Sequence, residues 1–145
     1  MPKALIVYAT RTGNTRKIGE FIAEGLRMTG TEVDLQDATA IKDAERLKGY
    51  DAYVFGSATY HGEMMSSMKQ LLFLAEKADL SGKCGGSFGS FGWSGEAPDR
   101  ILNTMKHVLN MNTTGDCLRL KSPELDGALP MAQGYGKQVG QKAGD

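Results

Sequence analysis

The chain lacks an excess of charge of either sign, because 17 lysines and arginines balance 17 aspartates and glutamates over 145 residues. It therefore has no basic footprint for nucleic acid or for an anionic membrane surface. It also lacks any apolar stretch near the roughly 20 residues of a membrane span, and the apolar run at residues 4–8 is too short for a signal peptide. These absences predict a cytoplasmic protein with no nucleic-acid or membrane partner.

Cysteine is scarce as well. Cys84 and Cys117 are the two cysteines, and they are far apart and form no CxxC pair. This usage fits a reducing compartment better than a disulfide scaffold, and both thiols are expected to be buried as small apolar groups. No group of histidine, cysteine and aspartate has metal-ligand spacing, so no metal is predicted. With no linker or internal repeat, the length suits one domain over residues 1–145.

Short apolar runs alternate with segments of helical periodicity along the chain. The continuous run at residues 4–8 is typical of a strand buried on both faces. Strands are expected at residues 4–8, 32–36, 50–56, 83–88 and 117–120, and helices at residues 15–30, 40–48, 64–77, 97–109 and 131–142. This alternation predicts an α/β fold, a doubly wound parallel sheet with helices on both faces.

In such sheets ligands bind at the carboxyl ends of the strands, which selects the loops after Tyr8, Phe55 and Phe88. The first loop precedes a helix and consists of Thr10, Arg11, Thr12, Gly13, Asn14 and Thr15. The free N–H groups and positive dipole of that helix attract an anion, and the hydroxyl and amide side chains can donate to it. We expect a phosphate group here.

The alternative is that Asn14 or Thr12 merely caps the helix, although capping needs only one such residue. Neither the spacing GxxxxGK[ST] nor GxGxxG is present. Nucleoside triphosphate hydrolysis is therefore disfavoured.

The other two loops carry aromatic residues. The loop after Phe88 holds Phe91 and the only tryptophan, Trp93, among small residues that cannot bury both rings. An exposed ring at a strand end can stack on a flat aromatic ligand, and the alternative is a tryptophan folded back over a helix. The loop after Phe55 adds another aromatic residue and a histidine. A phosphate anchor beside two aromatic loops suggests a planar heterocycle on a monophosphate tail, a description that FMN meets.

On residues 10–15 (TRTGNT), 57–59 (SAT) and 89–97 (GSFGWSGEA), the chain resembles a flavodoxin over nearly its full length. The first segment is similar to the TxTGNT phosphate loop of that family, and the others are most similar to the flavodoxin module of flavo-diiron proteins. The resemblance implies a short-chain flavodoxin with a five-stranded sheet of order 2-1-3-4-5 and bound FMN. It also implies transfer of single electrons to redox partner proteins by transient contact at the flavin edge, and we expect a monomer.

The resemblance further implies which residues hold the cofactor. The phosphate is expected at residues 10–15, and the isoalloxazine between two sets of loop residues: Ser57, Ala58, Thr59, Tyr60, His61 and Gly62 on one side, and Ser90, Phe91, Gly92, Trp93 and Gly95 on the other. Gly62 could permit a redox-linked peptide flip or simply form a tight turn. The sequence leaves both open.

Two points qualify the resemblance. Flavodoxins are typically strongly acidic, whereas this chain is balanced and has Arg11 inside the phosphate loop. One-electron transfer is therefore implied more firmly than a very low potential. The alternative function is a flavodoxin-fold oxidoreductase that reduces quinones or other small acceptors with NAD(P)H, but its substrate cavity usually needs longer loops or a dimer partner. A phosphoacceptor receiver is disfavoured, because no acid follows the first or third strand.

Overall fold

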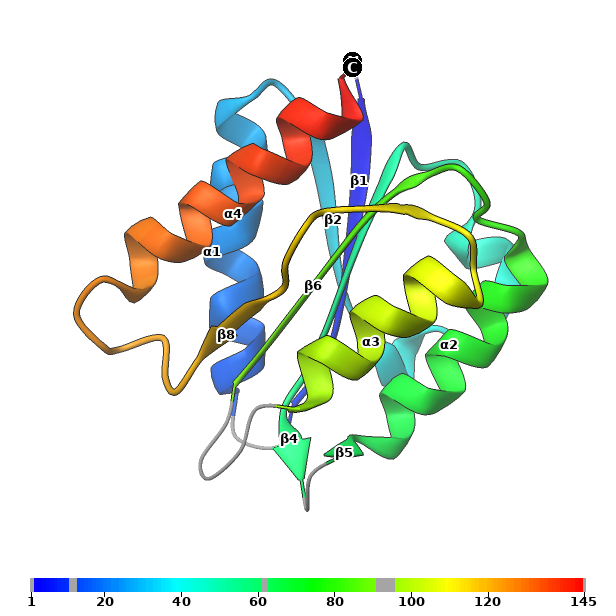
Figure 1. Cartoon of the computed structure of the whole chain (residues 1–145), viewed down its shortest axis with the longest axis horizontal. Coiled ribbons are helices and arrows are strands. Elements are labelled where there is room, and N and C mark those ends of the chain that lie inside the picture. Colours follow the sequence, from blue (N-terminus) through cyan, green and yellow to red (C-terminus); the bar gives the residue numbers. More distant parts are fainter. Residues whose placement is uncertain (1, 11–12, 61–62, 91–95, 145) are drawn as a thin grey trace.

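A computed structural model describes residues 2–10, 13–60, 63–90 and 96–144, with Tyr60 described through its backbone alone. Within these ranges, six strands form one sheet that helices cover on both faces (Figure 1). They are β1 Lys3–Ala9, β2 Glu32–Asp37, β3 Ala52–Ser57, β6 Cys84–Ser90, β7 Asn112–Thr113 and β8 Leu118–Leu120; β4 Thr59–Tyr60 and β5 Glu63–Met64 form a separate hairpin. The helices are α1 Asn14–Met28, α2 Ser66–Ala78, α3 Glu96–His107 and α4 Ala128–Ala143, with 3₁₀ turns η1 Ala38–Ala40 and η2 Ala44–Leu47.

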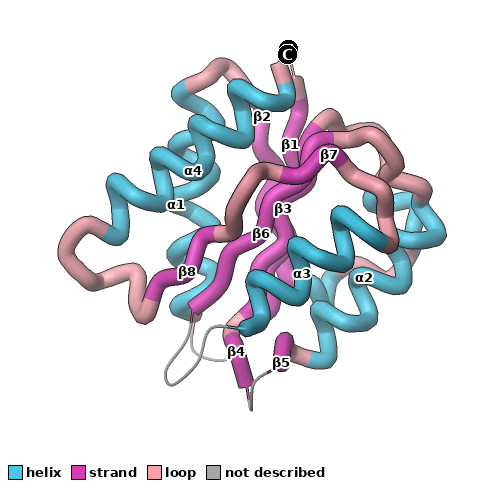
Figure 2. Tube along the Cα trace, in the orientation of Figure 1, coloured by secondary structure: helices cyan, strands magenta, loops and turns pink. Residues whose placement is uncertain are grey.

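The parallel sheet has the strand order β2-β1-β3-β6, with both β7 and β8 beside β6. β7 pairs with the beginning of β6, at Cys84 and Gly85, and β8 pairs with its end, from Phe88 to Ser90. Figure 2 shows β7 and β8 as two segments with a loop between them. Taken together they are one interrupted fifth strand, and the predicted flavodoxin-like order 2-1-3-4-5 is confirmed.

The interruption explains why the sequence indicated only the second part of the fifth strand. β7 is two polar residues long and therefore shows no apolar period. Opposite the gap, the N–H of Ser87 in β6 donates to the Tyr135 hydroxyl of α4 at 3.0 Å. Thr114 Oγ1 lies 2.9 Å from the same hydroxyl, and burial raises the pKa of Tyr135 to about 12. A side chain of α4 thus takes a hydrogen bond that a neighbouring strand would otherwise accept.

α1 and α4 cover one face of the sheet, and α2 and α3 cover the other (Figure 1). Alternate residues of β1 serve the two cores. Leu5 and Val7 belong to the cluster with α2 and α3, whereas Ala4 and Ile6 belong to the cluster with α1 and α4. All four are at most 1% exposed. Burial on both faces accounts for the continuous apolar run that predicted this strand.

The helix expected at residues 40–48 is wrong, because two separate 3₁₀ turns occupy this region. Asp37 accepts a hydrogen bond from the N–H of Thr39 at 2.9 Å, and Asp43 accepts one from the N–H of Glu45 at 3.1 Å. Each aspartate starts a new turn in place of continuing a helix, and the backbone at Ile41 between them is extended.

Two helices begin away from their predicted starts. The apolar period began at residue 64, but Met64 pairs with Thr59 in the β4–β5 hairpin, so α2 begins at Ser66. α4 begins at Ala128, three residues before its predicted start at 131. Pro130 lies in its first turn, where proline is tolerated because the N–H it lacks has no intrahelical acceptor.

α1 and α4 approach each other closely through glycine residues. A Cβ atom at Gly25 of α1 would lie 2.0 Å from the carbonyl oxygen of Gln133 in α4, and one at Gly136 would lie 2.2 Å from the carbonyl oxygen of Ile22. Both obstacles are backbone atoms, which cannot move aside as the end of a side chain can. Because Gly25 and Gly136 have no side chains, the two helices can lie this close together, and their contact fixes the position of α1 over the sheet.

This packing predicts opposite outcomes for two glycine substitutions. Gly25→Ala should lower the free energy of unfolding by about 1–3 kcal/mol or more, because the added methyl group overpacks a backbone contact. Gly134→Ala is the matched control, since a Cβ there would meet nothing within 4 Å, and helix propensity should then raise stability by up to about 1 kcal/mol. Urea unfolding of the two variants measures both effects, and a Gly25→Ala protein as stable as the parent would contradict the close approach.

Candidate functional site

The three loops selected by the sequence leave the sheet side by side. Ala9 at the end of β1 pairs with Ser57 at the end of β3, and Gly56 of β3 pairs with Phe88 of β6. Beyond the strands, the N–H of Ala58 donates to the carbonyl oxygen of Ala9 at 3.1 Å. The carboxyl ends of the three central strands therefore meet at one edge, where open α/β sheets bind ligands.

The N-terminus of α1 opens at this edge. Its N-cap, Gly13, has a φ of +90°, which glycine adopts without strain, and its N–H donates to the Thr10 hydroxyl at 2.9 Å. Among the described residues, no side chain caps α1, and Asn14 is the first helical residue. The first-turn N–H groups have no intrahelical acceptors. This arrangement favours an anion site over the capping alternative at Asn14, while Thr12 lies outside the described residues.

A buried hydroxyl pair joins α1 to β6. Thr15 Oγ1 and Ser90 Oγ lie 2.9 Å apart, although the two residues are 75 positions apart in the chain. Thr15 is fully buried and Ser90 is 7% exposed. The pair therefore ties the predicted phosphate loop to the beginning of the tryptophan-containing loop. A phosphate, which offers only acceptor oxygens, suits a site built from N–H groups and hydroxyls.

The loop after β3 is closed at its base by Ser57. The buried Ser57 hydroxyl accepts a hydrogen bond from the N–H of Met65 at 2.9 Å and donates to the carbonyl oxygen of Ala58 at 2.8 Å. Thr59 lies in β4, and its hydroxyl accepts a hydrogen bond from the N–H of Ala97 in α3 at 3.2 Å. These two side chains hold the β4–β5 hairpin against the first turn of α3, and so connect the second and third loops.

Several predicted site residues lie outside the described residues. They are Arg11, Thr12, His61, Gly62, Phe91, Gly92, Trp93 and Gly95, and of Tyr60 the backbone alone is described. The stacking of Trp93 and the peptide flip at Gly62 therefore stay predictions. The structure places Thr10, Gly13, Asn14, Thr15, Ser57, Ala58, Thr59 and Ser90 at or beside the carboxyl edge of the sheet.

Two acidic side chains near this edge are paired with basic ones. Glu63 in β5 lies 3.1 Å from the Lys69 ammonium and 3.4 Å from the Arg100 guanidinium. The hydrogen bond from Lys69 holds the pKa of Glu63 below its usual value. Asp99 forms an ion pair with Arg119. Basic groups thus offset two of the carboxylates near the described part of the site.

The fold brings together one group of potential metal ligands that the sequence does not reveal. Ligand atoms of Asp99, Asp116 and Cys117 all lie within 4.8 Å of one another, but Asp99 comes from α3, and no short spacing reveals it. The Cys117 thiol donates to Asp99 at 3.2 Å, and burial, followed by this hydrogen bond, raises the pKa of Cys117 to about 12. Because a metal binds the thiolate and Arg119 already pairs with Asp99, we interpret the group as a link between α3 and β8.

Neither cysteine should react while the protein is folded. Burial raises the pKa of Cys84 to about 11, and the pKa of Cys117 is about 12. The thiolate is the nucleophile, and an exposed thiol has a pKa of about 8.5, so at pH 8 iodoacetamide should label the folded chain at least about 100-fold more slowly than the unfolded chain. The labelling rate of the folded chain should rise about tenfold per pH unit above pH 8 and level off only near pH 11, because the thiolate fraction does so. Equal rates for folded and urea-unfolded protein would contradict the burial of the thiols.

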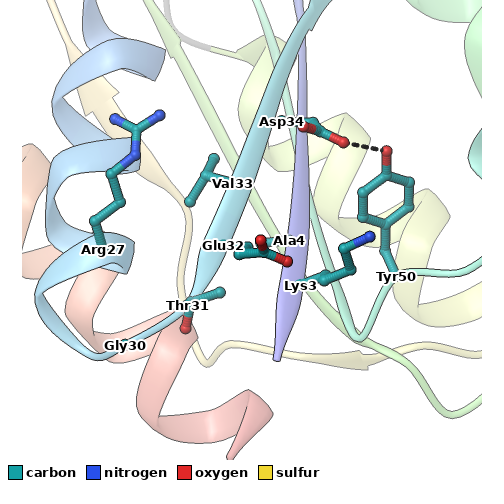
Figure 3. Close-up of a pocket in the computed structure, with 9 residues that line it drawn as sticks. All are labelled: Lys3, Ala4, Arg27, Gly30, Thr31, Glu32, Val33, Asp34 and Tyr50. Carbon is teal, nitrogen blue, oxygen red and sulfur yellow. Dashed lines mark hydrogen bonds between the residues drawn. The ribbon is translucent and has the colours of Figure 1, made fainter. Parts of the chain in front are cut away.

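A cavity of about 480 Å³ lies at the opposite edge of the sheet, near the amino ends of β1 and β2. Figure 3 shows Lys3, Glu32 and Asp34 around it, with the Tyr50 hydroxyl donating to Asp34 at 2.6 Å. Burial, followed by that hydrogen bond, raises the pKa of Tyr50 to about 12. The charges of both signs there do not converge on one ligand chemistry, and the strand-end rule places the functional site at the other edge.

The family model of the flavodoxin domain matches residues 5–117 of the chain. A flavodoxin of Maridesulfovibrio salexigens is 31% identical in an alignment 150 residues long, gaps included, that covers 96% of this chain and 100% of that protein. The solved structure of a flavodoxin from the domain Archaea superposes with a TM-score of 0.91 at 29% identity, covering 99% of both chains. The flavodiiron protein from Giardia intestinalis gives a TM-score of 0.88 at 26% identity, with 97% of this chain matching 36% of that one.

The parallel sheet, with a helix N-terminus at its carboxyl edge that no described side chain caps, defines an α/β protein with an edge suited to an anionic ligand. The family match extends over most of the chain, and the chain belongs to the flavodoxin family. The predicted resemblance, including the likeness to the flavodoxin module of flavodiiron proteins, is confirmed, as are FMN as the cofactor and electron transfer as the function. None of the helices in the described ranges has the length and hydropathy needed to cross a bilayer.

Proposed function

We propose that the chain, as one domain over residues 1–145, shuttles single electrons between redox partner proteins in the cytoplasm, and that it acts as a monomer. The observation that carries this proposal is the N-terminus of α1, which no described side chain caps and beside which the Thr15 hydroxyl is buried. N–H groups and hydroxyls at a positive helix end stabilise a phosphate dianion. Such a site anchors a mononucleotide by its tail.

FMN supplies the redox chemistry when bound, because it takes up and releases electrons one at a time. The residues of the chain hold and position it. We assign phosphate binding to Thr10, Arg11, Thr12, Gly13, Asn14 and Thr15, and the ring to the loops of Ser57, Ala58, Thr59, Tyr60, His61 and Gly62 and of Ser90, Phe91, Gly92, Trp93 and Gly95. The hydrogen bonds of Ser57 and Thr59 support this assignment, because the first closes the base of one loop and the second joins that loop to the first turn of α3.

The short second loop favours a carrier over an enzyme with its own substrate. Its base is closed by the bond between Ser57 and the N–H of Met65, so the hairpin between them has little length for the wall of a substrate cavity. Electrons would then leave through contact between the flavin edge and a partner protein. The alternative, reduction of quinones or other small acceptors with NAD(P)H, becomes an outcome of the test.

The test is the flavin content and reactivity of the purified protein. We expect a yellow protein with one FMN per chain, released on denaturation, and reduction by dithionite under anaerobic conditions. NADH and NADPH with quinones should be consumed no faster than by free FMN at the same concentration. Binding of FAD in preference to FMN would contradict the cofactor site, and rapid NAD(P)H oxidation would favour the enzyme over the carrier.

Trp93 gives a second test, because it is the only tryptophan and its fluorescence is therefore unambiguous. If Trp93 stacks on the isoalloxazine or covers its edge, its emission should be strongly quenched in the holoprotein and should recover when FMN is removed. Trp93→Ala should weaken the binding of FMN and of riboflavin to a similar extent, because the lost contact is with the ring. Identical emission from apoprotein and holoprotein would place Trp93 away from the flavin.

A further inference from the structure

The Thr15–Ser90 hydroxyl pair contains one more proton than its own hydrogen bond uses. Thr15 is in the first turn of α1 and Ser90 is the last residue of β6, and their oxygens are 2.9 Å apart. In the described part of the chain, neither hydroxyl has a second hydrogen-bond partner. Two hydroxyls carry two protons, and the bond between them consumes one. The other proton needs an acceptor that these ranges of the chain do not provide.

The burial of the pair makes a donor without an acceptor energetically costly. Thr15 is 0% exposed and Ser90 is 7% exposed, so bulk water is a poor substitute for an acceptor, and a buried donor without one is unfavourable. The pair lies beside the N-terminus of α1, which no described side chain caps and whose first N–H groups also need acceptors. A phosphate group supplies acceptors to both.

We propose that Ser90 is a positioning residue for the cofactor phosphate and acts through Thr15. Ser90 donates its proton to Thr15 Oγ1, and the Thr15 proton is thereby directed to the phosphate. Donation by Ser90 also polarises the Thr15 hydroxyl, which strengthens its bond to a charged acceptor. This inference rests on the proposed function, since it needs a phosphate at α1. It moves the Ser90 side chain from the ring-binding set given under the proposed function to the phosphate, and leaves the ring to the other residues of that set.

The test compares FMN with riboflavin, which lacks the phosphate. In the apoprotein, Ser90→Ala should lower the affinity for FMN by about threefold to tenfold, the usual range for one neutral hydrogen bond, and should leave the affinity for riboflavin unchanged. The matched control is Ser87→Ala, which removes another buried hydroxyl of the same strand. The Ser87 hydroxyl donates to the carbonyl oxygen of Pro98 at 2.7 Å. It should leave the ratio of FMN to riboflavin affinity unchanged.

A double-mutant cycle distinguishes action through Thr15 from direct contact. Thr15→Val keeps the side-chain volume and removes its donor, and should lower FMN affinity by about tenfold or more. Ser90→Ala added to Thr15→Val should then change FMN affinity by less than about twofold. Additive losses would overturn the proposal, as would equal losses for FMN and riboflavin or an Ser90→Ala protein that binds FMN as the parent does.

A second variant and a second probe cover failure of the first. Ser90→Cys keeps the shape of the side chain but is a weaker donor, so it should also lower the affinity for FMN. This variant replaces Ser90→Ala in the comparison if Ser90→Ala does not fold. Inorganic phosphate should raise the melting temperature of the parent apoprotein more than that of either Ser90 variant. If the parent bound no flavin, the proposed function would fail, and the phosphate measurement would still decide the role of Ser90: equal protection of parent and variants would overturn it.

Discussion

The site depends on the parallel register of β1, β3 and β6, which brings their carboxyl ends to one edge. Ala9 pairs with Ser57, and Gly56 pairs with Phe88, so the loops leave the sheet as neighbours although their residues are far apart in the chain. The register is strongly specified because each strand is buried on both faces, and a slip of one residue would exchange the side chains of the two cores. The core therefore positions the site.

Two contacts fix the position of α1 with respect to this edge. Along its length, Gly25 lets the backbone of α4 approach, which holds the helix against the sheet. At its N-terminus, Thr15 is bonded to the end of β6, and Gly13 turns the chain into the helix with a positive φ. The first-turn N–H groups of α1 are thus held in place before a ligand arrives, which lowers the cost of ordering this helix end on binding. The paired charges of Glu63 with Lys69 nearby add no strong field of one sign.

The sequence predicted the layers of the fold because burial on two faces leaves a plain pattern, as in β1, and because α1 has a clear helical period. It failed where local hydrogen bonds replace periodicity. Asp37 and Asp43 each start a 3₁₀ turn in a segment that reads as a helix. β7 was missed because two polar residues carry no period. In the gap between β7 and β8, Tyr135 of α4 accepts the hydrogen bond from the N–H of Ser87, and no sequence pattern marks that role. The rule that ligands bind at the carboxyl ends of parallel strands located the site and single residues in it, such as Thr15. It did not show which residues form hydrogen bonds with them.

Contacts between elements were beyond the sequence for a simple reason. The Thr15–Ser90 pair joins residues 75 positions apart, and the hydrogen bond from Ala97 to Thr59 spans 38 positions. No spacing rule reaches across such distances, because the separation is set by the lengths of the intervening helices and loops. A threonine in a predicted phosphate loop is readable from the sequence, whereas its hydrogen-bond partner Ser90 is visible only in the structure.

The claim on which the account rests is that α1 and its hydroxyls hold a phosphate dianion. The most direct measurement is the ³¹P NMR shift of bound FMN followed from pH 5 to pH 8. The second pKa of a free phosphate monoester is about 6, and a positive helix end with hydrogen-bond donors favours the dianion and lowers this pKa. The account predicts a single resonance whose shift does not change over this range. A shift that titrates with a midpoint near pH 6, as for free FMN, would contradict it.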